Sequence, residues 1–426
     1  MRAVNHNQHA VEKILARAAG RASVFAGQIV ECQVDLAEVN DLYLQTIRSF
    51  HDMGGKRVRH PDRITFILDH YAPAATIQQA ENQKQMRQFC REQDIHQLFD
   101  VGAGVCHQVM VDEGLVYPGM VLVATDSHTT THGAFGAFGT GVGATDLAVI
   151  MRTGQLWFRV PEVVRIELNG TIQRGVFAKD IILYIIGNLG ADYAIYKVVE
   201  FCGEVLKDLS ISERMALCNM TTEMGAKASY IQPDKRTFDF LRHKVNVDYH
   251  VFESDPDYRY STDLSYDVSQ IEPQLSAPHS VDNVAPIHRF EGLSVDQAYL
   301  GSCTGGRTED VGIAARILDG RKIHSRTRFI VVPASKDVYL ESMAQGYIDI
   351  LVRAGATIVT PGCAACLGTH AGILTAGEVC ISSTNRNFPG RMGHTGAQIY
   401  LGSPAAVAAS ALEGKITNPV RYLNGD

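Results

Sequence analysis

Three cysteines follow two apolar runs in the last third of the chain. Cys303 comes shortly after residues 297–300, and Cys363 and Cys366 come shortly after residues 356–360, each within a glycine-containing segment. Such runs are typical of buried strands, and in open α/β sheets the carboxyl ends of the strands are where sites are built. Three thiols at such an edge suit a metal ion or an iron–sulfur cluster, which is commonly held by cysteine thiolates, normally four of them. A cluster with three thiolate ligands would leave one iron open to a substrate.

The cysteine pattern also has other uses. The C-x-x-C spacing of Cys363 and Cys366 occurs in redox-active pairs and as half of a zinc site. The chain contains nine cysteines, an odd number that fits a reducing compartment better than a framework of disulfides. The N-terminus has one early arginine but no apolar segment of the secretory kind. We therefore expect a cytoplasmic location.

Acidic and imidazole side chains follow three further apolar runs. They are Asp69 and His70 after residues 64–68, His107 after residues 99–106, and Asp126 and His128 after residues 121–125. Titratable groups are costly to bury without partners, so the end of a strand at a cleft is a natural position for them. A helix cap or a turn would explain any one of these positions. Three such strand ends, together with two cysteine segments, predict one shared site.

The composition is that of an ordinary α/β protein. Of 426 residues, 46% are hydrophobic and 20% are charged, and this length allows two to three domains. The net charge is −7 and the chain has no run of basic residues, which argues against nucleic acid as a partner. The longest apolar stretch, near residues 181–186, is far too short to span a bilayer.

Periodicity divides the chain into three α/β segments. We expect domains over residues 1–160, 161–284 and 285–426. Apolar spacing predicts helices at residues 10–18, 76–92, 146–157 and 213–224, the last one capped by Ser212. Residues 133–143 contain five glycines, but their spacing is not that of a phosphate-binding loop. Close packing beside a cofactor, or the start of a helix, explains these glycines better.

Five segments together resemble the aconitase superfamily, and within it the large subunits of 3-isopropylmalate dehydratase and homoaconitase. They are residues 125–129 (TDSHT), 218–226 (CNMTTEMGA), 301–304 (GSCT), 363–366 (CAAC) and 385–391 (NRNFPGR). The likeness runs from the opening helix to the closing one, in the same order along the chain. It implies an α/β fold of the aconitase-like kind, with three α/β/α domains around a central iron–sulfur cleft and without the swivelling fourth domain.

The resemblance also implies roles for individual residues. A [4Fe–4S] cluster with one open iron would be held by Cys303, Cys363 and Cys366. The implied catalytic residues are Asp69, His70, His107, Asp126, His128 and Glu223. The implied substrate-binding residues are Ser127, Asn219, Asn385, Arg386 and Arg391. In this scheme Asp69 and His70 assist departure of the hydroxyl group, His107 pairs with Asp126, His128 pairs with Glu223, and the arginines hold carboxylates.

The implied activity is that of a hydro-lyase, which isomerises a 2-alkylmalate by dehydration and rehydration. The first candidate is 3-isopropylmalate dehydratase of leucine biosynthesis, and the alternatives are homoaconitase or a dehydratase of dimethylmalate or another alkylmalate. In single-chain relatives a swivelling domain follows and supplies the serine that removes the proton. We expect a separate small subunit of about a domain's size to provide it, in a heterodimer.

Two positions depart from the family pattern. Gly305 stands where the family usually has asparagine after Ser-Cys-Thr, and Asn40-Asp41 stands where a His-Asp pair is usual. Asp41 is therefore left out of the predicted catalytic set, and a specialised substrate stays open. A cluster-sensing protein that has lost catalysis, and a zinc-stabilised structural protein, are the alternatives of other classes. The retained acids and histidines argue against the loss of catalysis.

Overall fold

The computed structural model describes residues 7–423, and within these residues the strands form four sheets. The first is a five-stranded parallel sheet in the order β4-β3-β2-β5-β6. Its strands are β2 (Leu36–Asn40), β3 (Ile64–Ile67), β4 (Gln97–Phe99), β5 (Val121–Ala124) and β6 (Phe138–Gly141). The helices of this part are α2 (Leu44–Asp52), α3 (Ile77–Glu92), α4 (Cys106–Asp112) and α5 (Ala144–Thr153). Strands β2, β3 and β5 are buried along their whole length; β3 and β5 are nearly continuously apolar, as expected of buried parallel strands, whereas β2 also contains Glu38 and Asn40.

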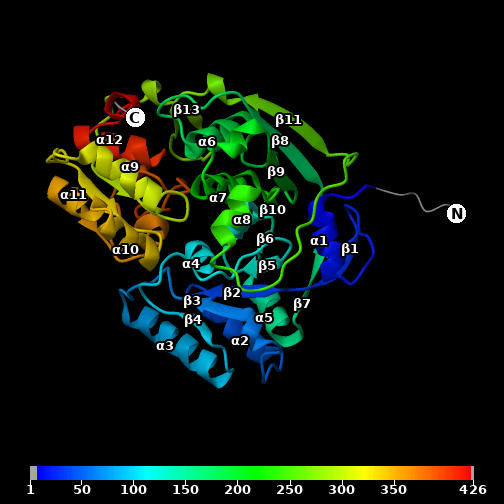
Figure 1. Cartoon of the computed structure of the whole chain (residues 1–426). Helices are drawn as coiled ribbons and strands as arrows, with labels where there is room; N and C mark the ends of the chain where they lie inside the picture. Colours follow the sequence, from blue (N-terminus) through cyan, green and yellow to red (C-terminus); the bar gives the residue numbers. More distant parts are fainter. Residues whose placement is uncertain (1–6, 424–426) are drawn as a thin grey trace.

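The second sheet has the order β10-β9-β8-β11, and all of its pairings are parallel. Its strands are β8 (Val163–Asn169), β9 (Val198–Cys202), β10 (Ala228–Ile231) and β11 (Thr262–Asp267). Its helices are α6 (Ala178–Leu189), α7 (Ile211–Met220) and α8 (Lys235–Leu241). In Figure 1 these green elements lie above the blue and cyan strands of the first sheet.

The third sheet has seven strands in the order β13-β12-β18-β17-β14-β15-β16. Five of them pair in parallel: β14 (Gln297–Leu300), β15 (Arg328–Val331), β16 (Thr357–Ile358), β17 (Val379–Ser382) and β18 (Gln398–Leu401). Two antiparallel strands, β12 (Gln274–Ser276) and β13 (Val284–Pro286), complete one edge. The helices are α9 (Thr308–Leu318), α10 (Lys336–Ala344), α11 (Tyr347–Ala354) and α12 (Pro404–Glu413). They form the yellow-to-red part on the left in Figure 1.

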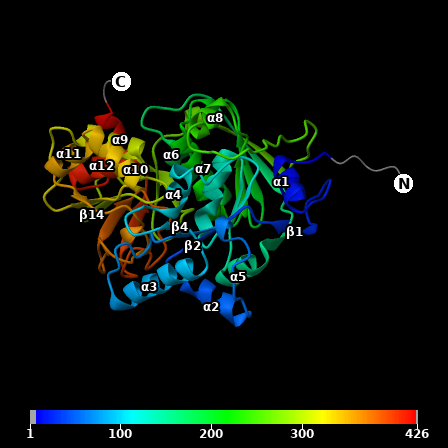
Figure 2. The ribbon, with the colours of Figure 1, turned by 60° about the horizontal axis from the view of Figure 1, so that its bottom comes forward.

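A small antiparallel ribbon joins β1 (Ile29–Gln33) to β7 (Gln155–Arg159) beside α1 (Ala10–Ala18). Figure 2 shows α2 and α3 on the outer side of the first sheet, away from helices α9 to α12. One large apolar core contains side chains from all three larger sheets, including Ile67, Val199 and Tyr299. The carboxyl ends of β3 and β14 therefore face a common interior.

Two predicted helices end differently from the expectation. The helix expected over residues 146–157 ends at Thr153, because Gly154 adopts a left-handed conformation (φ +77°) and the alternating residues that follow form β7. The helix expected over residues 213–224 is α7, which begins at Ile211 with Ser210, not Ser212, as its cap. A 3-10 turn over Thr221–Met224 follows it.

We propose that the three larger sheets mark three α/β units close to the predicted domain ranges, whose outer limits fall outside the described residues. Strands β12 and β13 lie before or at the boundary expected near residue 284, yet they pair in the third sheet. We therefore propose that the third unit begins near residue 274. No helix within the described part of the chain is long and apolar enough to cross a membrane.

Candidate active site

Three carboxylates lie at the carboxyl edge of the first sheet because their strands are neighbours. Asp41 follows β2, Asp69 follows β3 and Asp126 follows β5, and β2 pairs in parallel with both of the others. Parallel strands end at the same edge, so side chains that are about thirty to eighty residues apart in sequence meet there. The shared site predicted from strand ends thus has a topological cause.

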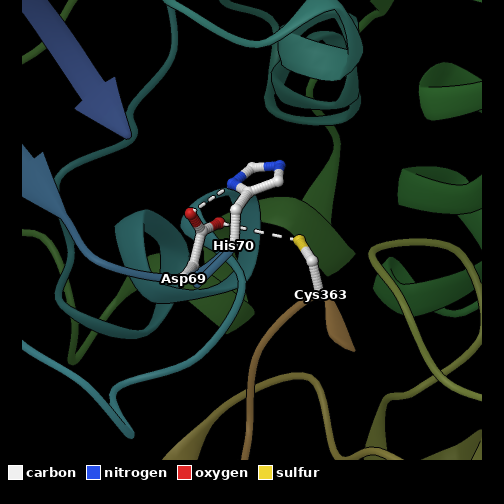
Figure 3. A group of neighbouring side chains, drawn as sticks. All are labelled: Asp69, His70 and Cys363. Carbon is white, nitrogen blue, oxygen red and sulfur yellow. Dashed lines mark hydrogen bonds and ion pairs between the residues drawn. The ribbon is translucent and has the colours of Figure 1, made fainter. Parts of the chain in front are cut away.

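His70 is held between two of these carboxylates. Its Nδ1 lies 2.6 Å from Asp69 Oδ1, and its Nε2 lies 3.6 Å from Asp126 Oδ2. Burial alone would lower the pKa of His70, but Asp69, Asp126 and Asp41 together raise it to about 9. The ring therefore carries a proton at neutral pH. Figure 3 shows Asp69 between His70 and Cys363, and the ligand-type atoms of these three residues all lie within 4.8 Å of one another.

Asp41 was not part of the predicted catalytic set, but it contacts the segment that carries His70 directly. Its Oδ1 accepts a hydrogen bond from His70 N at 2.8 Å, and its Oδ2 accepts one from Tyr71 N at 2.9 Å. Gln83 Nε2 donates to the same Oδ2 at 3.0 Å. Asp41 thus fixes the backbone that carries His70. The signal that marked Asp69 is weak here, because the strand before Asp41 contains Glu38 and Asn40 and is not a continuous apolar run.

Asp126 accepts hydrogen bonds from two histidines. His107 Nε2 lies 3.0 Å from Asp126 Oδ1, and the backbone N–H of His128 donates to the same oxygen at 2.7 Å. Burial would raise the pKa of Asp126, but the hydrogen bonds from His107 and His128 hold it well below the ordinary value. Gly141 makes this packing possible, because a Cβ there would lie 2.7 Å from Asp126 O.

His128, Glu223 and Arg386 form a second connected group. His128 Nε2 lies 2.7 Å from Glu223 Oε1, which also accepts a hydrogen bond from Arg386 Nε at 2.8 Å. Arg386 Nη2 donates to Ser127 Oγ at 2.9 Å. Burial would raise the pKa of Glu223, but His128 and Arg386 lower it overall. Glu223 is therefore a carboxylate that orients both an imidazole and a guanidinium group.

The three predicted thiols are buried, and none of the nine cysteines, all within residues 7–423, forms a disulfide. Cys303 packs against Cys363 and Val105. Asn219 Nδ2 lies 3.1 Å and Asn385 Nδ2 lies 3.5 Å from Cys303 Sγ. Arg391 Nη2 lies 3.8 Å from Cys366 Sγ. Amide and guanidinium donors directed at sulfur favour thiolates, and so fit a bound metal or cluster.

Burial raises the pKa of the Cys303 thiol to about 11, with Asp126 and Cys366 acting in the same direction. Burial likewise raises the pKa of the Cys363 thiol well above its ordinary value, and the negative charge of Asp69 adds to this effect. Thiolate ligands must lose their protons when they bind a metal. Loading of this site is therefore expected to release protons.

Gly305 is explained by packing. A Cβ at this position would lie 2.5 Å from both Cβ and Oγ of Ser383. The Ser383 hydroxyl is itself engaged, since it accepts a hydrogen bond from Gly301 N at 2.9 Å and donates to carbonyl oxygens of Gly301 and Gly305. The segment that carries Cys303 is thus packed directly on the segment that leads to Asn385, and the asparagine usual in the family has no room here.

Comparisons with known proteins agree with this geometry. The family model described as "Aconitase family (aconitate hydratase)" matches residues 12–414. The chain is 48% identical to "3-isopropylmalate dehydratase large subunit 1" of Methanopyrus kandleri, over 97% of this chain and 99% of that protein. It is 50% identical to the "Probable methanogen homoaconitase large subunit" of Methanothermobacter thermautotrophicus, over 96% of each chain.

A solved structure gives the same fold at much lower identity. Aconitase X of Thermococcus kodakaraensis in its holo form matches with a TM-score of 0.52 and 12% identity, over 89% of this chain and 90% of that chain. The predicted aconitase-like α/β fold and the predicted hydro-lyase class are confirmed by these comparisons. This chain belongs to the aconitase family.

Proposed function

We propose that this chain is the large, catalytic subunit of a 3-isopropylmalate dehydratase, in which Cys303, Cys363 and Cys366 hold a [4Fe–4S] cluster. One observation carries the proposal: the three thiols are buried beside acid–base groups, with Cys363 grouped with Asp69 and His70, and with Cys303 next to Asn385, which directly precedes Arg386 of the His128–Glu223–Arg386 group. Such a cluster, held by three protein ligands, would supply one open iron as a Lewis acid for the hydroxyl and a carboxylate of the substrate.

The protein groups then supply proton transfer and charge. Dehydration breaks a C–O bond and the neighbouring C–H bond, so the departing hydroxyl must gain a proton and the carbon must lose one. His70 carries the first proton, because Asp69 at 2.6 Å keeps its imidazole protonated at neutral pH. Rehydration on the other carbon uses the same groups in reverse, which yields the isomer.

Arginine side chains would hold the substrate carboxylates. Arg386 is fixed by Glu223 Oε1 and Ser127 Oγ, so its planar guanidinium group has a defined direction at the site. Arg391 lies 3.8 Å from the Cys366 sulfur, next to the proposed cluster. Arginine grips carboxylates through two parallel hydrogen bonds, and such groups stabilise negative charge as it develops on the substrate.

We propose that Asp126 keeps His107 and His128 in fixed positions, and that Glu223 does the same for the outer nitrogen of His128. A carboxylate bonded to one ring nitrogen decides which nitrogen carries the proton and raises the basicity of the imidazole. Asn219 and Asn385 donate toward the Cys303 sulfur and so line the same pocket.

The group that removes the carbon-bound proton is proposed to come from a separate small subunit. The curated relatives with 43–50% identity are themselves called large subunits. In the family resemblance the missing base is a serine on a swivelling domain. We therefore propose a heterodimer in which the small subunit covers the cleft and completes the site.

Homoaconitase is the second candidate, because a relative called a homoaconitase large subunit is as similar to this chain as the dehydratases are. Both reactions use the same dehydration and rehydration, and differ in the side chain of the malate. We propose that the small subunit carries much of that selectivity.

The test is anaerobic reconstitution of the chain, followed by addition of the proposed small subunit. Proton NMR would follow isopropylmalate, homocitrate, citrate, citramalate and dimethylmalate in parallel. Preferred turnover of isopropylmalate supports the first candidate, and preferred turnover of homocitrate supports the second. A fully loaded pair that turns over none of the five acids would refute both and favour a cluster-sensing role. Zinc in place of iron and acid-labile sulfide would favour a structural metal site.

A further inference from the structure

Lys179 is a buried cation beneath the proposed cluster site. It is 2% exposed and lies in the first turn of α6. No carboxylate within residues 7–423 forms an ion pair with it at 4.0 Å or less. The adjacent Asp180 is engaged elsewhere, because its oxygens accept hydrogen bonds from Gln274 N and Phe177 N at 2.9 Å each. A cation in this position is therefore unusual and needs a physical reason.

Two effects act against a positive charge at this place. Removal of an ammonium group from water is costly unless it is paired. The first turn of a helix also presents unbonded N–H groups with a partial positive charge, which disfavours a cation there. Burial lowers the pKa of Lys179 to about 8, and Cys303, Glu223 and Cys366 act in the opposite direction. The ammonium form therefore still predominates at neutral pH.

The contacts of Lys179 join two segments that carry proposed site residues. We call residues 301–307 the Cys303 loop and residues 383–391 the Asn385 loop. Lys179 Nζ donates to Thr384 O at 2.7 Å and to Ser383 O at 3.2 Å in the Asn385 loop, and lies 3.4 Å from Thr304 Oγ1 in the Cys303 loop. Thr304 Oγ1 itself donates to Ser383 O at 2.8 Å.

These contacts place Lys179 next to the ligands without touching them. Thr304 directly follows Cys303, and Asn385, which directly follows Thr384, has its Nδ2 3.5 Å from the Cys303 sulfur. A fourth contact, to Met220 Sδ at 3.6 Å, ties Lys179 to the end of α7, next to Asn219. Met220, Thr304 and Thr384 are thus each one residue away from a group at the thiol site, and Ser383 is two residues away from Asn385.

We propose that Lys179 is a positioning residue of the cluster site: its ammonium group fixes the Cys303 loop against the Asn385 loop and supplies a buried positive charge that offsets the thiolates. This inference rests on the cluster ligation proposed above. Three thiolates and a cluster add negative charge to a buried region, and a fixed cation nearby compensates part of it. A fixed cation also favours the more negative, reduced form of the cluster.

The experiment compares the reconstituted wild-type chain with K179M, K179R and K227M. Methionine keeps the length of the side chain but removes the charge, and arginine keeps the charge. Lys227 is the matched control, because it is partly buried, donates to Gly141 O at 3.3 Å and contacts neither loop. Iron and sulfide content, the rate of cluster loss to a chelator and the reduction equilibrium, followed by EPR, are measured on each chain without turnover.

For K179M we expect cluster loss at least tenfold faster than in the wild type. We also expect a shift of at least tenfold toward the oxidised cluster, equal to 59 mV for a one-electron couple. K179R should stay within threefold of the wild type in the reduction equilibrium, and K227M should match the wild type in both measurements. If K179M does not fold by circular dichroism, K179Q, which keeps a donor for the carbonyls but no charge, should show the same shift.

The inference is overturned if the uncharged variants load and reduce like the wild type, if K179R shifts as far as they do, or if K227M shifts equally. These outcomes differ from failure of the proposed function. A wild-type chain that binds no cluster would overturn both proposals, whereas a loaded wild type with an unaffected K179M would overturn this one alone.

Discussion

Asp41 offers a direct test of how the first sheet positions His70. The perturbation is Asp41→Asn, which preserves shape but leaves only one oxygen. The wild-type carboxylate accepts three hydrogen bonds, from His70 N, Tyr71 N and Gln83 Nε2 at 2.8 to 3.0 Å. An asparagine amide has only one oxygen that can accept these hydrogen bonds. Its NH2 group takes the place of the second carboxylate oxygen and must then face N–H groups, which are also donors.

The magnitude follows from these contacts. A hydrogen bond to a charged group contributes about 1.5–3 kcal/mol, so the loss of one or two has a gross cost of about 1.5–6 kcal/mol. Part of this is offset, because burial and the nearby Asp69 raise the pKa of Asp41, and the variant removes a charge that is costly to bury. We therefore expect a net effect near the lower limit. Loss of a partner that orients a functional imidazole typically costs about 10–100-fold in activity, or about 1.4–2.7 kcal/mol.

The assay uses chains matched for iron content and combined with the small subunit. Initial rates are followed through the ultraviolet absorbance of the unsaturated intermediate, and kcat and KM are determined separately. We expect D41N to lose about 10–100-fold in kcat with a smaller change in KM, because Asp41 touches the His70 segment and not the substrate. The control is D52N, an exposed aspartate at the end of α2, which should behave as wild type.

A D41N chain with full iron content and unchanged kcat would refute this reasoning, since His70 would then keep its place without Asp41. A loss of iron in D41N would point instead to a role in packing the sheet edge against the segment of Cys363, whose N–H donates to Asp69 O at 2.9 Å.

Three further predictions concern the thiols, Gly305 and Asp180. Cys303→Ala should abolish retention of a four-iron cluster, measured as iron and sulfide per chain, whereas Cys380→Ala, at a buried cysteine inside β17, should leave both contents unchanged. Gly305→Ala should destabilise the chain by about 1–3 kcal/mol, seen as a lower melting temperature, because its Cβ would lie 2.5 Å from Ser383 Cβ; an unchanged melting temperature would contradict this packing. Burial raises the pKa of Asp180 from 3.8 to about 7, so the folded chain holds a proton between pH 4 and 7 that the unfolded chain releases. The contribution of Asp180 to stability should therefore fall as pH rises from 4 to 7, by up to a few kcal/mol at about 1.4 kcal/mol per pKa unit, and then level off. Asp180→Asn should lack this contribution, so its change in thermal stability between pH 5 and 7.5 should differ from that of the wild type by this amount, although it is less stable overall because it loses one acceptor for Gln274 N or Phe177 N; an identical change in both proteins would assign the titration to other groups.

Much of the site could be predicted from the sequence because it is encoded locally. Buried parallel strands are continuous apolar runs, and each polar residue directly after such a run lies at the sheet edge where sites form. Asp69, His70, Asp126 and His128 were found by this rule, and the motifs around Cys303 and Cys363 extended it to the third sheet. The family, the α/β fold and the hydro-lyase class followed from the order of these motifs and are confirmed by the comparisons.

Element boundaries were less predictable where two local signals compete. Residues 144–157 contain an apolar pattern that fits a helix almost throughout, but Gly154 ends it and the last residues pair with β1. Ser212 is a good helix cap by type, yet Ser210 is the cap because its side chain reaches Glu213 N and Glu213 returns the bond. The pairing with β1 is a contact with a distant segment, whereas the Ser210–Glu213 capping box is a local signal that competes with Ser212.

The sequence by itself determined which residue types stand at the ends of strands, and therefore which chemistry this protein can perform. Only the tertiary structure decided which of them meet. Asn40 departs from the family's usual His-Asp pair and left Asp41 unassigned, yet Asp41 holds His70 because β2 lies beside β3. In the sequence, Lys179 is an ordinary residue of a predicted helix. Only the fold places it in contact with Thr304 and Thr384. In the sequence, Gly305 replaces the asparagine that is usual in the family. Only the structure shows that Ser383 occupies the space that a side chain at this position would need. Contacts between residues far apart in sequence depend on how the sheets pack against one another. A local sequence pattern does not specify that packing.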